Sequence, residues 1–144
     1  MTQDNFQEKI ITLTRSFGWH RPAETPCGQP VSIAEAHALM EIARADGVSQ
    51  NELAVSLNLA KSTVSRLVSK FVKREWIYRS SNPDDRRAYK LYLTKQGKAV
   101  AQELAEARQL KMARIMEQIP DNQIEMILDA IDILVLAIRK GEIK

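Results

Sequence analysis

The sequence predicts a mainly α-helical fold with one small β-hairpin. Apolar residues at helical spacing recur along most of the 144-residue chain. Residues 76–93 instead alternate apolar and polar side chains around a cluster of turn formers. Between Val48 and Gly97 a short amphipathic helix, a basic helix and this hairpin follow one another without interruption. That order of elements is typical of a winged helix-turn-helix.

Two helices are predicted before this module. The N-terminal one has apolar residues on two sides, namely Phe6, Ile10, Leu13, Phe17 and, apart from these, Ile11. The other is expected to open with a capping box formed by Ser32 and Glu35 and to end at Gly47. Its inward-facing residues are predicted to be Leu39, Met40 and Ala43. This second helix should brace the helix-turn-helix.

The helix-turn-helix itself is predicted from Ser49 onward. Ser49 and Glu52 form a second capping box, and Asn58 stands where a left-handed residue must reverse the chain. A further helix should begin near Lys61. Its buried face is predicted from the i, i+3, i+4, i+7 series Val64, Leu67, Val68 and Phe71.

The other side of this last helix carries small hydroxyls interleaved with cations. The exposed set is Lys61, Ser62, Thr63, Ser65, Arg66, Ser69 and Lys70. Serine and threonine fit a groove, while lysine and arginine reach phosphates and guanine edges. We therefore predict that this helix enters the major groove of double-stranded DNA; the alternative is an ordinary solvated helix face.

The hairpin is predicted from a strand at 76–79, a turn at 80–86 and a return strand at 89–93. Asp85, Arg86 and Arg87 should then lie at or near its tip. An arginine on a narrow loop suits the minor groove, where negative potential is concentrated. Two long helices follow, one capped by Thr94 and one beginning at Pro120–Asp121.

The charge distribution supports a nucleic-acid partner. Residues 61–98 hold eleven lysines and arginines against three acids, a local charge of +8 in a chain whose net charge is +3. The rest of the chain therefore carries −5. Such asymmetry indicates a basic module on a protein whose other surfaces must not bind nucleic acid.

Two motifs within this module resemble the MarR family of bacterial transcriptional regulators. The first runs from Leu53 to Val68, and the second joins Asp85 and Arg87 to the Leu93-Thr94-x-x-Gly97 sequence that closes the hairpin. Asn58 and Ala60 depart from the family pattern, which more often has glycine and a capping residue there. The resemblance implies a regulator that binds DNA, with DNA-reading residues 32–94 and helical dimerisation segments 1–22 and 95–144 in a single domain.

We expect a homodimer, because the last helix carries Met126, Ile133 and Leu136 away from its main apolar stripe. The alternative is that these side chains belong to the core of one subunit. Two-fold symmetry predicts an inverted-repeat operator with half-sites about one helical turn apart. A repressor released by a small effector is the expected function.

The effector is less constrained by the sequence. A small aromatic or anionic ligand could bind an apolar cleft lined by Phe17, Trp19, His37 or Met40. Cys27 is a possible redox sensor, although it lies in a proline-bounded loop without a second cysteine. The spacings of His20, Glu24, Cys27 and His37 match no standard zinc site, so no metal and no cofactor is predicted.

Other classes of function are disfavoured. Cys27 with His37 is the only conceivable nucleophile–base pair, and no Asn or Asp is evidently placed to orient the imidazole, so an enzyme is not expected. An architectural DNA-binding protein with little sequence preference is the stronger rival. No apolar run is long enough to cross a membrane and no leader sequence is evident, which predicts a cytoplasmic protein without a membrane partner.

Overall fold

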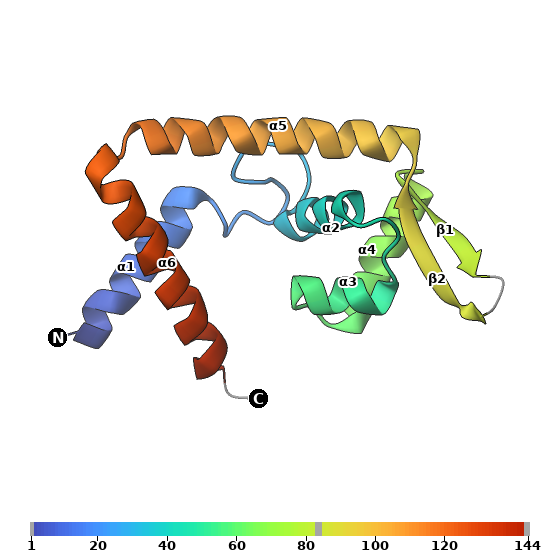
Figure 1. Ribbon diagram of the computed structural model, residues 1–144, viewed down its shortest axis with the longest axis horizontal. Coiled ribbons are helices and arrows are strands. Elements are labelled where there is room, and N and C mark those ends of the chain that lie inside the picture. Colours follow the sequence, from blue (N-terminus) through green and yellow to red (C-terminus); the bar gives the residue numbers. More distant parts are fainter. Residues whose placement is uncertain (1, 83–84, 143–144) are drawn as a thin grey trace. The chain divides into compact units, whose positions relative to one another are not determined.

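A computed structural model describes residues 2–82 and 85–142, and it describes the side chains of 2–80 and 89–142. The chain is mainly helical with a two-stranded antiparallel hairpin, as the sequence predicts (Figure 1). Its elements are α1 (Thr2–Phe17), α2 (Ile33–Arg44), α3 (Gln50–Leu57), α4 (Lys61–Lys73), β1 (Ile77–Asn82), β2 (Asp85–Leu93), α5 (Lys95–Glu117) and α6 (Asp121–Gly141). The chain divides into two units, Met1–Ala107 and Arg108–Lys144, so that α5 belongs to both.

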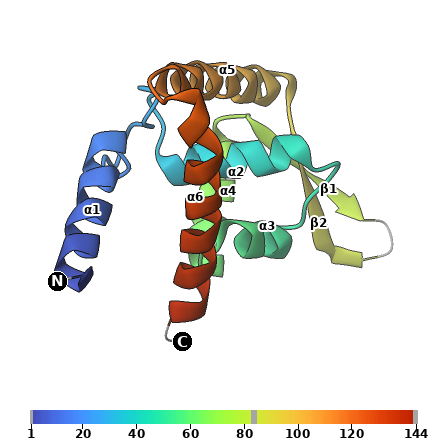
Figure 2. The same cartoon turned by 60° about the vertical axis from the view of Figure 1, so that its left-hand side comes forward.

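The core of the first unit lies among α2, α3, α4 and the hairpin. Helix α3 packs against both α2 and α4, while the two strands pack against α4, α2 and α3 (Figures 1 and 2). The largest fully buried side chains are Phe71, Leu39, Leu53, Ile77, Leu91, Val64 and Val68. Leu104 of α5 joins the same core. The helix that should read DNA is therefore held by apolar contacts along one whole side.

The predicted helix starts are confirmed. The hydroxyls of Ser32 and Ser49 accept the backbone N–H groups of Glu35 and Glu52, each at 3.1 Å. Asn58 adopts the left-handed conformation, with φ 53° and ψ 48°. Each serine satisfies a donor that the first helical turn would otherwise leave unpaired, so local chemistry fixes where these helices begin.

The end of α2 differs from the prediction. The helix ends at Arg44 rather than at Gly47, Ala43 is exposed, and Ile42 is buried in its place. The reason is a bridge between Val48 and Leu91 of β2, which requires the chain to leave the helix early. Gly47 makes the connecting turn with φ +87°, a conformation that side chains disfavour.

The hairpin is longer than predicted. Strand pairing continues through Ser81↔Tyr89 to Asn82↔Asp85, with an irregularity between Ser81 and Asn82. Residues of the predicted turn are part of β1 and β2, because hydrogen bonding between strands uses backbone groups and not side chains. The backbone of Arg86 and Arg87 thus lies in β2, near the hairpin end as expected, while the side chains of Asp85, Arg86 and Arg87 lie outside the described residues.

A compact junction joins the end of α4, the base of the hairpin and the start of α5. Glu75 has φ +62° and ends α4 in a Schellman arrangement, in which Trp76 N–H reaches the Phe71 carbonyl at 3.0 Å. The Thr94 hydroxyl donates to the Glu75 carbonyl at 2.6 Å and accepts the Gly97 N–H at 3.0 Å. Thr94 therefore caps α5, as predicted, and also ties it to the hairpin base.

The second unit consists of the end of α5 and all of α6. Helix α6 has no buried residue, and seven of its large apolar side chains are exposed: Met126, Leu128, Ile131, Ile133, Val135, Leu136 and Ile138. Helix α1, in the first unit, likewise has no buried residue and exposes Phe6, Ile11 and Leu13. None of the helices within the described residues is long and apolar enough to span a bilayer.

We predict that Gly97→Ala destabilises the fold by about 2 to 4 kcal/mol. A Cβ at position 97 would overlap the backbone carbonyl of Trp76, which cannot turn aside as a flexible side chain could. Chemical denaturation monitored by circular dichroism measures the change. Gly141→Ala is the matched control, because a Cβ there meets nothing within 4 Å. Equal stability of the two variants would contradict the proposed packing.

Candidate nucleic-acid interface

One face of α4 presents polar side chains to solvent. Ser62, Arg66, Ser69 and Lys73 follow the i, i+4, i+7, i+11 spacing of a single helical stripe, and all four are exposed. Lys61 and Ser65 are exposed beside this stripe. We call these six residues the α4 face. Lys73 is not among the residues predicted from the sequence, because it lies one turn beyond the Lys61–Lys70 segment that carries the hydroxyls.

The α4 face is backed by a fully buried one. Val64, Val68 and Phe71 are all 0% exposed, so α4 cannot rotate without opening the core. The α4 face is thereby presented in a fixed orientation. Its chemistry combines short hydroxyls, which allow close approach, with an arginine that can donate two parallel hydrogen bonds to guanine. A lysine near the end of the helix can pair with a phosphate.

Two of the predicted DNA contacts lie elsewhere on α4. Thr63 is half-buried, on the flank of the helix rather than on the α4 face. Lys70 reaches the same flank, where its Nζ lies 3.0 Å from Oε1 of Glu35 on α2. Sequence reasoning could not find this partner, because the two residues lie 35 positions apart and Glu35 had been assigned only a local capping role.

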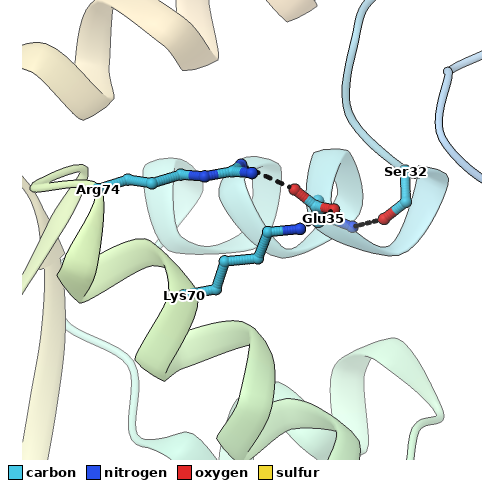
Figure 3. A network of polar contacts seen from close by, with 4 residues as sticks. All are labelled: Ser32, Glu35, Lys70 and Arg74. Carbon is cyan, nitrogen blue, oxygen red and sulfur yellow. Dashed lines mark hydrogen bonds and ion pairs between the residues drawn. The ribbon is translucent and has the colours of Figure 1, made fainter.

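Glu35 is the centre of a polar network between α2 and α4 (Figure 3). Its side chain is 9% exposed, and its second carboxylate oxygen lies 3.1 Å from the Arg74 guanidinium. The guanidinium also lies 4.8 Å from the centre of the Trp76 ring, at cation–π distance. Burial would raise the pKa of Glu35, but hydrogen bonding and charge from Lys70, together with Ser32 and Arg74, hold that pKa below its ordinary value.

The hairpin extends the basic surface. Arg79 and Lys90 are exposed on β1 and β2. The rings of Tyr78 and Tyr92 stack with centres 5.5 Å apart, across the pair of residues that face each other in the register. This stack stabilises the base of the hairpin, where β1 begins and β2 ends, since aromatic pairs across two strands add to the stability of their pairing.

The effector candidates are only partly brought together. Phe17 and Trp19 stack with ring centres 4.5 Å apart, and Trp19 is 45% exposed. Met40 is half-buried and His37 is exposed on α2. Two open hollows flank Val55 on α3, and none of these four residues lines either. The pocket therefore remains a prediction.

The structure places the other candidate sensors in no common site. Cys27 is half-buried in the loop before α2. Glu24 pairs with Arg21 at 3.1 Å rather than with a histidine. Within the described part of the chain, no three histidine, cysteine, aspartate or glutamate side chains converge as metal ligands would.

Residues 29–88 match the model of the MarR family. The chain is also similar to a protein of Thauera aromatica assigned as a transcriptional regulatory protein for the hcr operon, with 36% identity over 59 residues. This alignment covers 41% of the chain and spans 36% of the relative's length. The family match spans α2, α3, α4, β1 and the first part of β2.

Solved structures share the fold over nearly the whole chain. Streptococcus pneumoniae FabT, solved in complex with DNA, aligns with a TM-score of 0.74 at 18% identity, covering 96% of both chains. A MarR transcriptional regulator from Methanosarcina mazei aligns with a TM-score of 0.70 at 21% identity, covering 96% of this chain and 99% of that one. At these identities the likeness establishes the winged helix fold, including the helices at both ends.

We predict that Glu35→Gln lowers stability by about 1 to 2 kcal/mol at neutral pH, since its buried carboxylate has two cationic partners. Because the pKa of Glu35 is lowered in the folded protein, this stabilisation is complete above the ordinary carboxyl pKa and is lost as the pH falls through the lowered value. Urea denaturation from about pH 6 to about pH 3 should show the difference between parent and variant shrinking.

Glu41→Gln is the control for this measurement. Glu41 lies on the same helix and pairs with Arg44, whose side chain is 76% exposed, so its loss should cost less than about 0.5 kcal/mol. A Glu35 effect as small as that of Glu41, or one that did not change with pH, would contradict the assigned network.

Proposed function

We propose that this chain is a MarR-family repressor that binds an operator as a homodimer and is released by a small effector; the match of residues 29–88 to the family model supports this. Members of this family are DNA-binding regulators rather than enzymes. The observation that carries the proposal is the α4 face, which is exposed, basic and rigidly backed by the core.

The α4 face supports sequence-specific binding rather than architectural binding. Arg66 stands at the middle of the stripe with Ser62 one turn before it and Ser69 about one turn after it. Such a side chain reads guanine edges, which differ between base pairs in the major groove. An architectural protein relies instead on phosphates, bending and inserted apolar side chains, rather than on one arginine flanked by short hydroxyls.

The homodimer is proposed from the apolar surface of the terminal helices. Ile133 is 70% exposed and Met126 is 62% exposed on α6, and Phe6 is 54% exposed on α1. Many exposed large apolar side chains along one helix, as on α6, favour a protein partner. A second copy of the chain is that partner, since DNA reading by two equivalent α4 helices requires a two-fold assembly.

The operator and the hairpin contact follow from this assembly. Two copies of α4 in successive major grooves require an inverted repeat whose half-sites are about one helical turn apart. We assign Arg86 and Arg87 to the adjacent minor groove, with Asp85 orienting the Arg87 guanidinium. This assignment rests on their sequence and on the place of their backbone near the hairpin end.

The effector is proposed to be a small apolar or aromatic molecule. Trp19 offers an exposed ring that is already stacked on Phe17, and Met40 lies half-buried on α2. An aromatic ligand gains stacking and burial at such a surface without requiring a charged partner. Cys27 has no neighbouring cysteine with which to form a disulfide, because it is the chain's only one, so a thiol switch is not favoured.

We predict that Arg66→Ala costs about 1 to 3 kcal/mol in operator binding and relaxes the preference at one base pair of each half-site. Footprinting of the DNA upstream of the protein's own gene locates the operator, and a panel of single-base operator variants then measures the preference. Arg114→Ala, which removes an exposed arginine from α5, is the control. Equal loss of affinity for every sequence would assign Arg66 to the phosphates instead.

We also predict that Ile133→Glu converts the dimer to monomers and weakens operator binding by at least tenfold. A buried unpaired carboxylate opposes association, and one α4 helix loses the contacts of the second. Sedimentation measures the assembly. Val55→Glu makes a similar change at an isolated valine that is 82% exposed on α3, and it should leave the dimer intact. A stable Ile133→Glu dimer would place the interface elsewhere.

A further inference from the structure

The basic charge of α4 is not all available to DNA. Lys70 and Arg74 lie on the flank of the helix that faces α2, whereas Arg66 and Lys73 lie on the α4 face. Both flank cations bind the same carboxylate, one on each oxygen, at 3.0 and 3.1 Å (Figure 3). The sequence alone does not separate these two pairs of cations.

The burial of the three groups is unequal, and this decides their role. The Glu35 side chain is 9% exposed, whereas those of Lys70 and Arg74 are 46% and 38% exposed. The anion is therefore fixed within the protein, while the cations lie where a phosphate could also reach them. Without Glu35, both would be free to turn toward a DNA backbone on that side of the helix.

We propose that Glu35 withholds Lys70 and Arg74 from DNA phosphates and so limits how strongly α4 binds DNA of any sequence. The inference rests on the proposed function, because it assumes that α4 enters the groove. Phosphate contacts add affinity for every duplex equally and carry no base information. A regulator that must leave non-specific DNA to find its operator benefits from fewer such contacts.

The structure also explains why Glu35 does this without disordering the helix. Its backbone N–H is bound by the Ser32 hydroxyl at 3.1 Å, which fixes the first turn of α2. Arg74 is held between the carboxylate and the Trp76 ring, so its guanidinium has a partner on two sides. Glu35 is thus a positioning residue, which acts on DNA binding through Lys70 and Arg74 rather than by contact.

The test measures affinity of the full chain for a short duplex of scrambled sequence across a series of salt concentrations. Each phosphate contact contributes about 0.9 to the slope of log K against log salt. Glu35→Gln should steepen the slope by up to about 3.6 per dimer, because each subunit frees two cations and each new phosphate contact contributes about 0.9. A role in stability alone would lower affinity without steepening this slope.

Glu41→Gln is the matched control, since it removes the same charge from the same helix. It releases only Arg44, whose ion pair with Glu41 lies within α2 and not on α4. Adding Lys70→Gln to Glu35→Gln should return the slope part of the way to the parent's value. A slope for Glu35→Gln no steeper than that for Glu41→Gln would overturn the proposal.

A second comparison does not depend on the folding of Glu35→Gln. In the parent background, Lys70→Gln should reduce the slope by less than half as much as Lys73→Gln does. Equal reductions would show that Lys70 already contacts phosphates and would overturn the inference. If Lys73→Gln and Arg66→Ala also left binding unchanged, α4 would not be the DNA-reading helix, and the proposed function would fail with it.

Discussion

The close approach of Gly97 to the Trp76 carbonyl fixes the geometry of the first unit around one point. Because position 97 has no Cβ, the first turn of α5 can lie against the backbone where α4 ends and β1 begins. Thr94 then closes the junction with one hydroxyl that both donates and accepts. Three elements are joined within a few residues, so the orientation of the hairpin and of α5 follows from the end of α4 rather than from a flexible connection.

Helix α4 is also held at its flank, by ion pairs to Glu35 on α2. The core holds the buried side of α4 through Val64, Val68 and Phe71, and the Glu35 network holds one of its lateral sides. The packing of the buried side of α4 does not depend on the side chains of the opposite face. That face can therefore carry serines and cations. The buried Glu35 carboxylate, by contrast, requires both of its cationic partners, since losing either one leaves buried charge uncompensated.

The terminal helices α1 and α6 differ from α4 in having no buried side. Neither α1 nor α6 has a buried residue, although both are rich in large apolar side chains. Helical propensity and capping can define where such helices begin and end, but they do not by themselves supply a core. This is the pattern expected where a second chain completes the core, as in the proposed homodimer.

The sequence by itself determined the elements whose signals are local. Ser32, Ser49 and Thr94 mark helix starts because each satisfies an adjacent backbone donor, and Asn58 marks the turn because it tolerates a left-handed backbone. Tertiary structure decided what depends on distant partners. The Val48–Leu91 bridge shortened α2, strand pairing included residues of the predicted turn in the hairpin, and the position of Glu35 gave Lys70 an ion-pair partner on another helix. Helical periodicity says which residues share a face, but only packing says which face a neighbour covers.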